Sequence, residues 1–160
     1  AETIYTTGAA GLTLGGWFRF TNAASATENL IAKRAAVGQL SYYMRRLADG
    51  TINLEISSTG SDTFDCTSDD TIAANIWTFI AARFTPSIEM AVWTNETQKT
   101  NTVSIPASIF ASTAAFKIGS SDGAVELMTG DATLCFLCAN ALGDDLISSL
   151  FQSSRVLFEI

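Results

Sequence analysis

The chain has 160 residues, of which 48% are hydrophobic and 16% are charged, and its formal net charge is −7. This length predicts one domain over residues 1–160 with a single large core, and the scarcity of charge excludes an intrinsically disordered chain. The negative charge argues against nucleic acid as a partner, and no apolar run approaches the roughly 20 residues that a bilayer requires, so we expect no membrane insertion.

Alternation of apolar and polar residues predicts β-strands along most of the chain. In the segment 12–20, Leu12 and Phe18 fall on one face, and Trp17 and Arg19 fall on the other. Further strands are expected at 29–33, 40–47, 51–57, 77–84, 89–94, 115–118 and 132–139, with terminal strands at 4–6 and 156–160.

Turn signals separate these runs. Asp49 and Gly50 lie between two alternating segments, as in a tight hairpin, and polar loop residues occupy 59–62, 95–97 and 120–123. The regular succession of short strands with almost no proline predicts two packed antiparallel sheets.

One segment has helical spacing instead. An apolar stripe recurs at intervals of three and four residues within 144–153, after Asp144 and Asp145, which suit the positive end of a helix dipole. The fold class that we predict is therefore all-β: a two-sheet antiparallel β-sandwich (jelly roll) with one short C-terminal helix.

The order of several motifs points to a family. They are Leu12-Thr13-Leu14-Gly15-Gly16-Trp17-Phe18, Leu30-Ile31-Ala32-Lys33, Tyr42-Tyr43-Met44-Arg45, the hairpin at 49–54, the Trp-centred run at 76–82, and the segments 90–95, 116–119, 130–134 and 141–142. In this order they resemble the laminin-G-like jelly rolls of the concanavalin A-like lectin and glucanase superfamily. The resemblance spans almost the whole chain and implies the same fold.

The chain departs from the family pattern at two places. Thr133 stands where the family usually has an acidic residue that serves calcium or a ligand loop, and Asp131 falls on the opposite face. The hairpin at Asn95 and Glu96 lacks the usual glycine, which implies a longer turn. We expect no cofactor. The alternative is Ca²⁺ in an oxygen-rich loop formed by Asp62, Asp65, Asp69 and Asp70.

Three cysteines, Cys66, Cys135 and Cys138, leave at least one thiol unpaired. We expect them to be small buried core residues, with a bridge from Cys66 to Cys135 or Cys138 as the alternative. Metal binding is disfavoured, because Cys135 and Cys138 are three apart in a predicted strand and point to opposite faces.

Catalytic chemistry is poorly supported. The chain has no histidine, which rules out histidine-based triads and the metal sites of legume-type lectins. The paired carboxylates of retaining glucanases are also missing, since Glu55 stands alone among apolar and hydroxyl residues and is expected to be a solvated strand position. We therefore predict that the protein is not an enzyme.

A glycan site needs only an exposed aromatic ring and hydrogen-bonding neighbours. Because Tyr42 and Tyr43 are adjacent in a strand, one of them must face away from the core. Trp93 is either at least half-exposed or part of the core, and the sequence favours neither. Lys33, Arg34, Arg45 and Arg46 are expected to form an ordinary ion-paired surface. The candidate ligand-binding residues are Tyr42, Tyr43, Arg45, Asn53, Trp93 and Asp122.

The surface composition bears on function and location. Serine and threonine number 16 and 20, and charge is sparse, which favours an assembly or extracellular surface. Asn95 begins the sequence Asn-Glu-Thr and is a candidate glycosylation site. The chain starts at Ala1 without a leader, so we expect a processed mature chain or an excised domain.

These observations predict a non-enzymatic structural or adhesive subunit outside the cell, on a cell surface or on a virion. It would assemble with itself or with other surface proteins through its jelly-roll faces and the terminal segments 1–7 and 155–160. The alternative is a carbohydrate-binding, lectin-like module, and a glycoside hydrolase using Glu55 is the third hypothesis.

Overall fold

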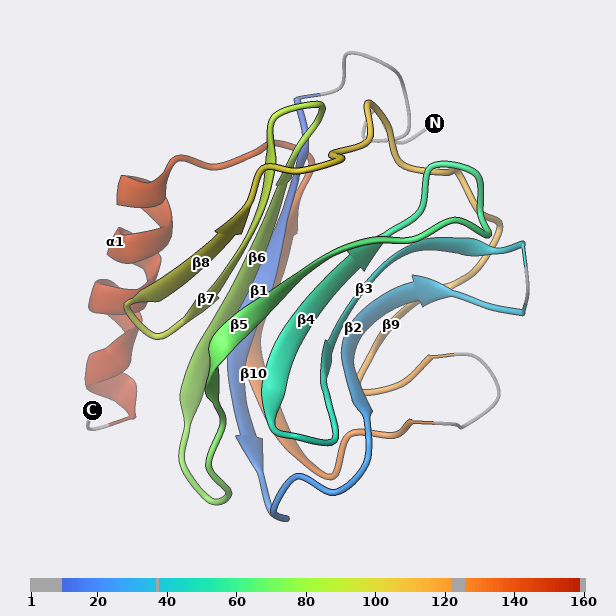
Figure 1. Ribbon diagram of the computed structural model, residues 1–160. Coiled ribbons are helices and arrows are strands. Elements are labelled where there is room, and N and C mark those ends of the chain that lie inside the picture. The colour runs from blue at the N-terminus through green and yellow to red at the C-terminus, as the bar shows by residue number, and fades with distance from the viewer. Residues whose placement is uncertain (1–9, 37, 122–125, 159–160) are drawn as a thin grey trace.

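The computed structural model describes residues 10–36, 38–121 and 126–158. Its elements are β1 (Leu12–Phe20), β2 (Glu28–Arg34), β3 (Leu40–Arg46), β4 (Thr51–Ile56), β5 (Phe64–Thr71), β6 (Thr78–Thr85), β7 (Glu89–Thr94), β8 (Thr97–Asn101), β9 (Phe116–Ile118), β10 (Gly130–Cys138) and α1 (Asp144–Ser154). Two antiparallel five-stranded sheets, in the orders β10-β1-β6-β7-β8 and β5-β4-β3-β2-β9, form the predicted sandwich (Figure 1).

The space between the two sheets is filled by one set of alternating residues. Leu12, Leu14, Phe18 and Phe20 of β1 point inward and are fully buried, as the period of two predicts. They meet the inward apolar residues of the second sheet, among them Leu54. The side chains between them in sequence are thereby directed to the two outer faces.

A buried ion pair lies at one end of this core. Arg46 of β3 and Glu28 of β2 are in direct contact, and the Arg46 guanidinium lies 3.9 Å from the centre of the Phe20 ring. Arg46 also donates to the backbone oxygen of Asn22 at 3.1 Å, and Glu28 accepts from the Thr129 amide at 2.9 Å. Each charge thus has several partners, as a buried ion needs.

Helix α1 covers the outer face of the first sheet (Figure 1). Its residues Ile147 and Phe151 are buried against Trp17, Phe79 and Trp93 of the sheet. The predicted helix is thus confirmed. No helix in the described part of the chain lies on the outer face of the second sheet.

Arginine 83 of β6 fixes the start of this helix. Its guanidinium donates to the Leu142 carbonyl at 2.7 Å and to Asp144 at 2.5 Å, and it lies 5.0 Å from the Trp93 ring.

The helices that the structure describes are too short to cross a membrane.

Several sequence-based expectations need correction. Strands β5 and β8 were not predicted from the sequence. β5 carries acids such as Asp65 that are typical of loops. Residues 155–157 form a 3₁₀ helix instead of the start of a terminal strand. The Phe158 ring stacks on Trp17 at 4.2 Å, which keeps this end folded against its own domain. Residues 4–6, 1–7 and 159–160 lie outside the described residues.

Two further local expectations are resolved by the structure. Thr94 pairs with Thr97, so the turn at Asn95 and Glu96 is tight rather than long. Asn95 adopts a φ of 56°, a left-handed conformation that asparagine tolerates in place of glycine. The three cysteines are free; Cys66 is buried, as expected, while Cys135 and Cys138 are only partly buried.

We expect Phe151→Ala to lower the free energy of unfolding by about 3–5 kcal/mol, because it removes the ring that fills the space between α1 and the sheet. Leu146→Ala on the same helix is the matched control, since Leu146 is 50% exposed and its truncation should change stability by about 0.5 kcal/mol or less. Urea unfolding of both variants measures the difference. Equal losses in the two would contradict the assigned packing.

Candidate functional site

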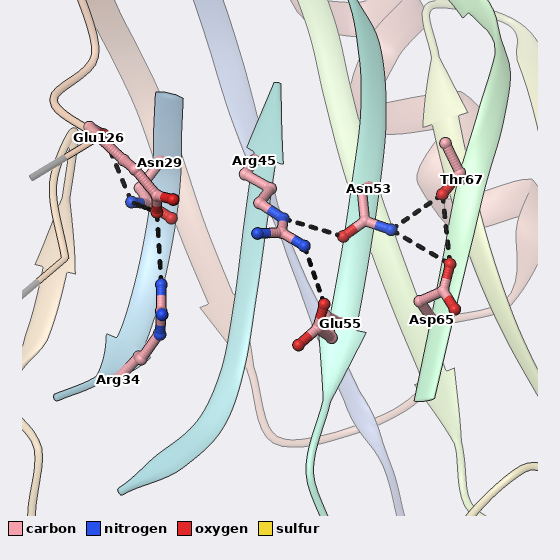
Figure 2. A network of polar contacts seen from close by, with 8 residues as sticks. All are labelled: Asn29, Arg34, Arg45, Asn53, Glu55, Asp65, Thr67 and Glu126. Atoms are coloured by element: carbon pink, nitrogen blue, oxygen red, sulfur yellow. Dashed lines mark hydrogen bonds and ion pairs between the residues drawn. The ribbon is translucent and has the colours of Figure 1, made fainter. Parts of the chain in front are cut away.

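Polar side chains from three neighbouring strands meet on the outer face of the second sheet. Arg45 of β3 pairs in register with Asn53 of β4, and Asn53 pairs with Thr67 of β5. These positions alternate with core residues such as Leu54, so their side chains point away from the core. The outer face therefore carries a polar row over β3, β4 and β5 (Figure 2).

Hydrogen bonds link this row from strand to strand. Arg45 donates through Nε to Asn53 Oδ1 at 3.2 Å and through Nη2 to Glu55 Oε2 at 2.9 Å. Asn53 in turn donates to Thr67 Oγ1 at 2.8 Å and to Asp65 Oδ2 at 3.3 Å (Figure 2). The bonds hold the long Arg45 side chain in one position.

A second polar group occupies β2 beside the row. Asn29 donates to Glu126 Oε2 at 2.9 Å, and Arg34 contacts the same oxygen at 3.3 Å (Figure 2). Asn29 Oδ1 is buried without a hydrogen-bond partner in the described part of the chain.

Tyrosine 43 lies beneath two arginines on this face. Its ring centre is 4.4 Å from the Arg45 guanidinium and 5.1 Å from that of Arg34. Burial, together with a hydrogen bond from its hydroxyl to Glu55, raises the pKa of Tyr43 well above the usual tyrosine value. The phenol therefore remains a neutral donor across the physiological range.

A hollow of about 220 Å³ opens next to Tyr43. Leu40 and Tyr43 supply apolar surface, Arg34 and Glu55 supply opposite charges, and small residues at 35, 36, 38 and 60 complete the lining with the hydroxyls of Ser61 and Thr63. Such a mixture of apolar surface and a few polar groups is typical of small-molecule sites.

The loop on one side of the hollow is organised by Asp62. Its carboxylate accepts hydrogen bonds from the hydroxyls of Ser57 and Ser58 and from the amides of Ser58 and Thr59, both at 2.8 Å. Burial opposes ionisation of Asp62, but these hydrogen bonds outweigh it and lower the pKa. Gly60, at a φ of 95°, follows the same turn and lies against the Phe110 ring.

The structure brings together only part of the predicted site. Tyr43, Arg45 and Asn53 share the outer face of the second sheet, but Tyr43 and Asn53 are only 4% and 3% exposed, so Tyr43 is not an open stacking platform. Tyr42 is 1% exposed and belongs to the core between the sheets, so it offers no surface for a ligand. Trp93 is 5% exposed beneath α1 on the other sheet, so the buried alternative is correct and Trp93 is no part of this site.

Three other predicted positions have different outcomes. Asp122 lies outside the described residues. Asn95 lies in the β7–β8 turn, where its Oδ1 accepts a hydrogen bond from the Phe79 amide at 3.0 Å. Glu55 is 8% exposed rather than a solvated strand position, because Arg45 and Tyr43 cover it.

Sequence reasoning missed that two acids face each other. Glu55 and Asp65 are directly opposed in the β4–β5 ladder and lie on the same outer face. A glycosidase acid must carry a proton to the leaving group, whereas Glu55 accepts hydrogen bonds from Arg45 and Tyr43. Both acids therefore belong to the hydrogen-bonded network of this face.

The acids proposed for a calcium loop diverge in the structure. Asp62 caps its own loop, Asp69 pairs with Lys99 at 2.9 Å, and Asp70 accepts from Thr94 at 3.1 Å. Within the described ranges, no three histidine, cysteine or acidic residues gather as a metal site would require.

A larger hollow of about 550 Å³ lies near the β7–β8 turn. Its charged lining residues, Asp70 and Glu96, are both acids, and the rest are mainly threonines and small or aliphatic residues. The smaller hollow combines both signs of charge with a tyrosine, and it adjoins the polar row. We therefore place the candidate site there.

The chain belongs to the Concanavalin A-like lectin/glucanases superfamily, whose family model matches residues 2–132. This match includes the two sheets up to the first residues of β10. The resemblance inferred from the motif order is confirmed. No curated protein matches the chain.

Solved structures share the fold. A heptameric SAP-like pentraxin from Limulus polyphemus is similar with a TM-score of 0.70 and 15% identity, over 89% of this chain and 70% of the pentraxin chain. The binding domain of botulinum neurotoxin DC, solved with rat synaptotagmin II, has a TM-score of 0.67 and 14% identity, over 92% and 37% of the two chains.

A third similar structure is the ligand-binding domain of botulinum neurotoxin serotype D in complex with N-acetylneuraminic acid. It has a TM-score of 0.66 and 12% identity, over 91% of this chain and 37% of the toxin chain. The chain thus spans little more than a third of the toxin structures. At these identities the similarity concerns the fold.

We expect the free energy of unfolding to fall as the pH drops below the ordinary aspartate pKa of 3.8. In this range Asp62 binds a proton in the unfolded chain, whereas in the folded chain its lowered pKa keeps it ionised. Asp62→Asn should remove this part of the acid dependence. Urea unfolding at about pH 7 and about pH 3 measures it. Asp145→Asn, at an exposed acid of α1, is the control and should keep the wild-type slope.

Proposed function

We propose that residues 1–160 form a single non-enzymatic jelly-roll domain that binds carbohydrate in the hollow beside Tyr43. The observation that carries the proposal is the lining of this hollow, in which Ala35, Ala36 and the small accessible parts of Leu40 and Tyr43 lie beside the charged Arg34 and Glu55. A sugar ring presents C–H groups on its faces and hydroxyls around its edge, so it uses both kinds of surface.

The charged groups suit sugar hydroxyls in particular. A hydroxyl both donates and accepts; a neighbouring guanidinium supplies the donor for its oxygen, and a neighbouring carboxylate supplies the acceptor for its proton. Arg34 and Glu55 are each held by other residues, Glu126 and Arg45 respectively, and are therefore positioned before a ligand arrives. Preorganised groups lose little freedom on binding, which favours affinity.

The comparisons support a binding role without assigning a ligand. The family includes lectins, and one similar structure holds N-acetylneuraminic acid. We extend sugar binding to this chain as a proposal and place the protein outside the cell, on a cell surface or on a virion. Its partners there would be glycans or other surface proteins, to which the sparse charge and the many hydroxyls of the chain are suited.

We expect a glycan array to reveal saturable binding. Titration calorimetry then measures the affinity for the best ligand. Arg34→Met and Glu55→Gln should each weaken binding by about tenfold or more, since each removes a charged hydrogen-bonding group worth about 1.5–3 kcal/mol. Arg19→Met is the matched control: Arg19 is an ion-paired arginine on the first sheet, and its loss should leave affinity unchanged.

The same samples test the hydrolase hypothesis. No release of reducing ends from the bound glycan is expected, and release that disappears in Glu55→Gln would show an enzyme instead. An array without any ligand, or binding that survives both substitutions, would refute the proposed site. Thermal unfolding of each variant establishes that a loss of binding is not a loss of fold.

A further inference from the structure

The hollow of about 550 Å³ lies where β5 and β7 end and β6 begins. Pockets that hold small molecules commonly have volumes of about 300–1,000 Å³. Thr78 of β6 lines the hollow and pairs in register with Phe18 of the core. Thr94 of β7 also lines it and pairs with Ile80 of the core. Because paired residues share a face, the hollow opens at one end of the space between the two sheets.

The charge that lines this hollow is negative and unbalanced. Asp70 and Glu96 line it, and no lysine or arginine of the described part of the chain does. Neither carboxylate forms an ion pair with a described residue. Asp70 of the second sheet accepts a hydrogen bond from Thr94 of the first at 3.1 Å, and Glu96 accepts one from Gln152 of α1. Both carboxylates are thus held at the hollow without a cation.

A buried hydroxyl in the same hollow also lacks a partner. Thr78 is 5% exposed, and its Oγ1 forms no hydrogen bond with any described residue. Buried polar groups are nearly always hydrogen-bonded, so an unpaired hydroxyl that lines a hollow is suited to bond a molecule that enters it. Asp70, Glu96 and Thr78 can all accept a hydrogen bond, which selects a ligand that donates.

We propose that this hollow binds a small aliphatic diamine through its two protonated amino groups. Each ammonium group carries a positive charge and three donors, which match the carboxylate and hydroxyl acceptors. The methylene chain between the amino groups would contact apolar surface, because Ile72 and Ile76 line the same hollow. Two carboxylates neutralise two ammonium groups, so a diamine is favoured over a monoamine.

The lining argues against other ligands of the same charge. Ca²⁺ takes roughly six to eight oxygen ligands, whereas no three acidic, histidine or cysteine residues gather within the described ranges as a metal would require. A quaternary ammonium group has no N–H to donate to Thr78. An amine that also carries phosphate would place that phosphate beside Asp70 and Glu96 without a cation to offset it.

The test is titration calorimetry of the purified chain with 1,4-diaminobutane at low salt. We expect saturable binding, and binding of butylamine, which has the same carbon chain and one ammonium group, should be about tenfold weaker. Asp70→Asn and Glu96→Gln should each weaken diamine binding by about tenfold or more, since each removes one carboxylate. Asp131→Asn is the matched control: Asp131 pairs with Arg19 and does not line the hollow, so affinity should stay unchanged.

Thr78→Val tests the site without breaking any side-chain hydrogen bond among the described residues. It should preserve the thermal unfolding temperature and weaken diamine binding by about threefold or more. No saturable diamine binding, equal affinity for butylamine, or binding undiminished in all three variants would overturn the proposal. Saturable Ca²⁺ binding that disappears in Asp70→Asn would overturn it as well. The proposal is independent of sugar binding, because the two hollows share no lining residue.

Discussion

The packing of two sheets against each other is the constraint on which the other features of this protein depend. It commits every second residue of a strand to the core and the intervening ones to an outer face. The outer faces of the two sheets differ in what covers them. The first sheet buries its outer aromatic residues under α1, whereas the second carries a bonded polar row that includes Arg45 and Asn53. In the described part of the chain, no helix covers this second outer face.

Much of the fold can be predicted from local sequence, and the strands that were predicted wrongly have local causes. The period of two located β1, β3, β4 and most other strands, because inward positions must be apolar. It failed at β5, where acids on the outer face obscured the alternation of Phe64 and Cys66 on the inner one. It failed again after residue 154, where the aromatic contact of Phe158 with Trp17 replaces pairing in a sheet.

The candidate site was less predictable, because it depends on register and on elements distant in sequence. Tyr43, Arg45 and Asn53 could be proposed from residue type, since adjacent strands of a hairpin carry them. The burial of Trp93 could not, because the covering helix begins at Asp144. The contact of Asn29 with Glu126 spans 97 positions, and the opposition of Glu55 and Asp65 depends on a strand that was not predicted.

The position of α1 has a consequence for how the polypeptide is made. The helix seals an aromatic surface built from strands β1, β6 and β7, yet it follows all three strands in the sequence. During synthesis on the ribosome, these strands emerge first, and Trp17, Phe79 and Trp93 stay uncovered until α1 has left the exit tunnel. Nascent chains and prematurely terminated products therefore share the same sticky surface, which makes them natural clients of chaperones.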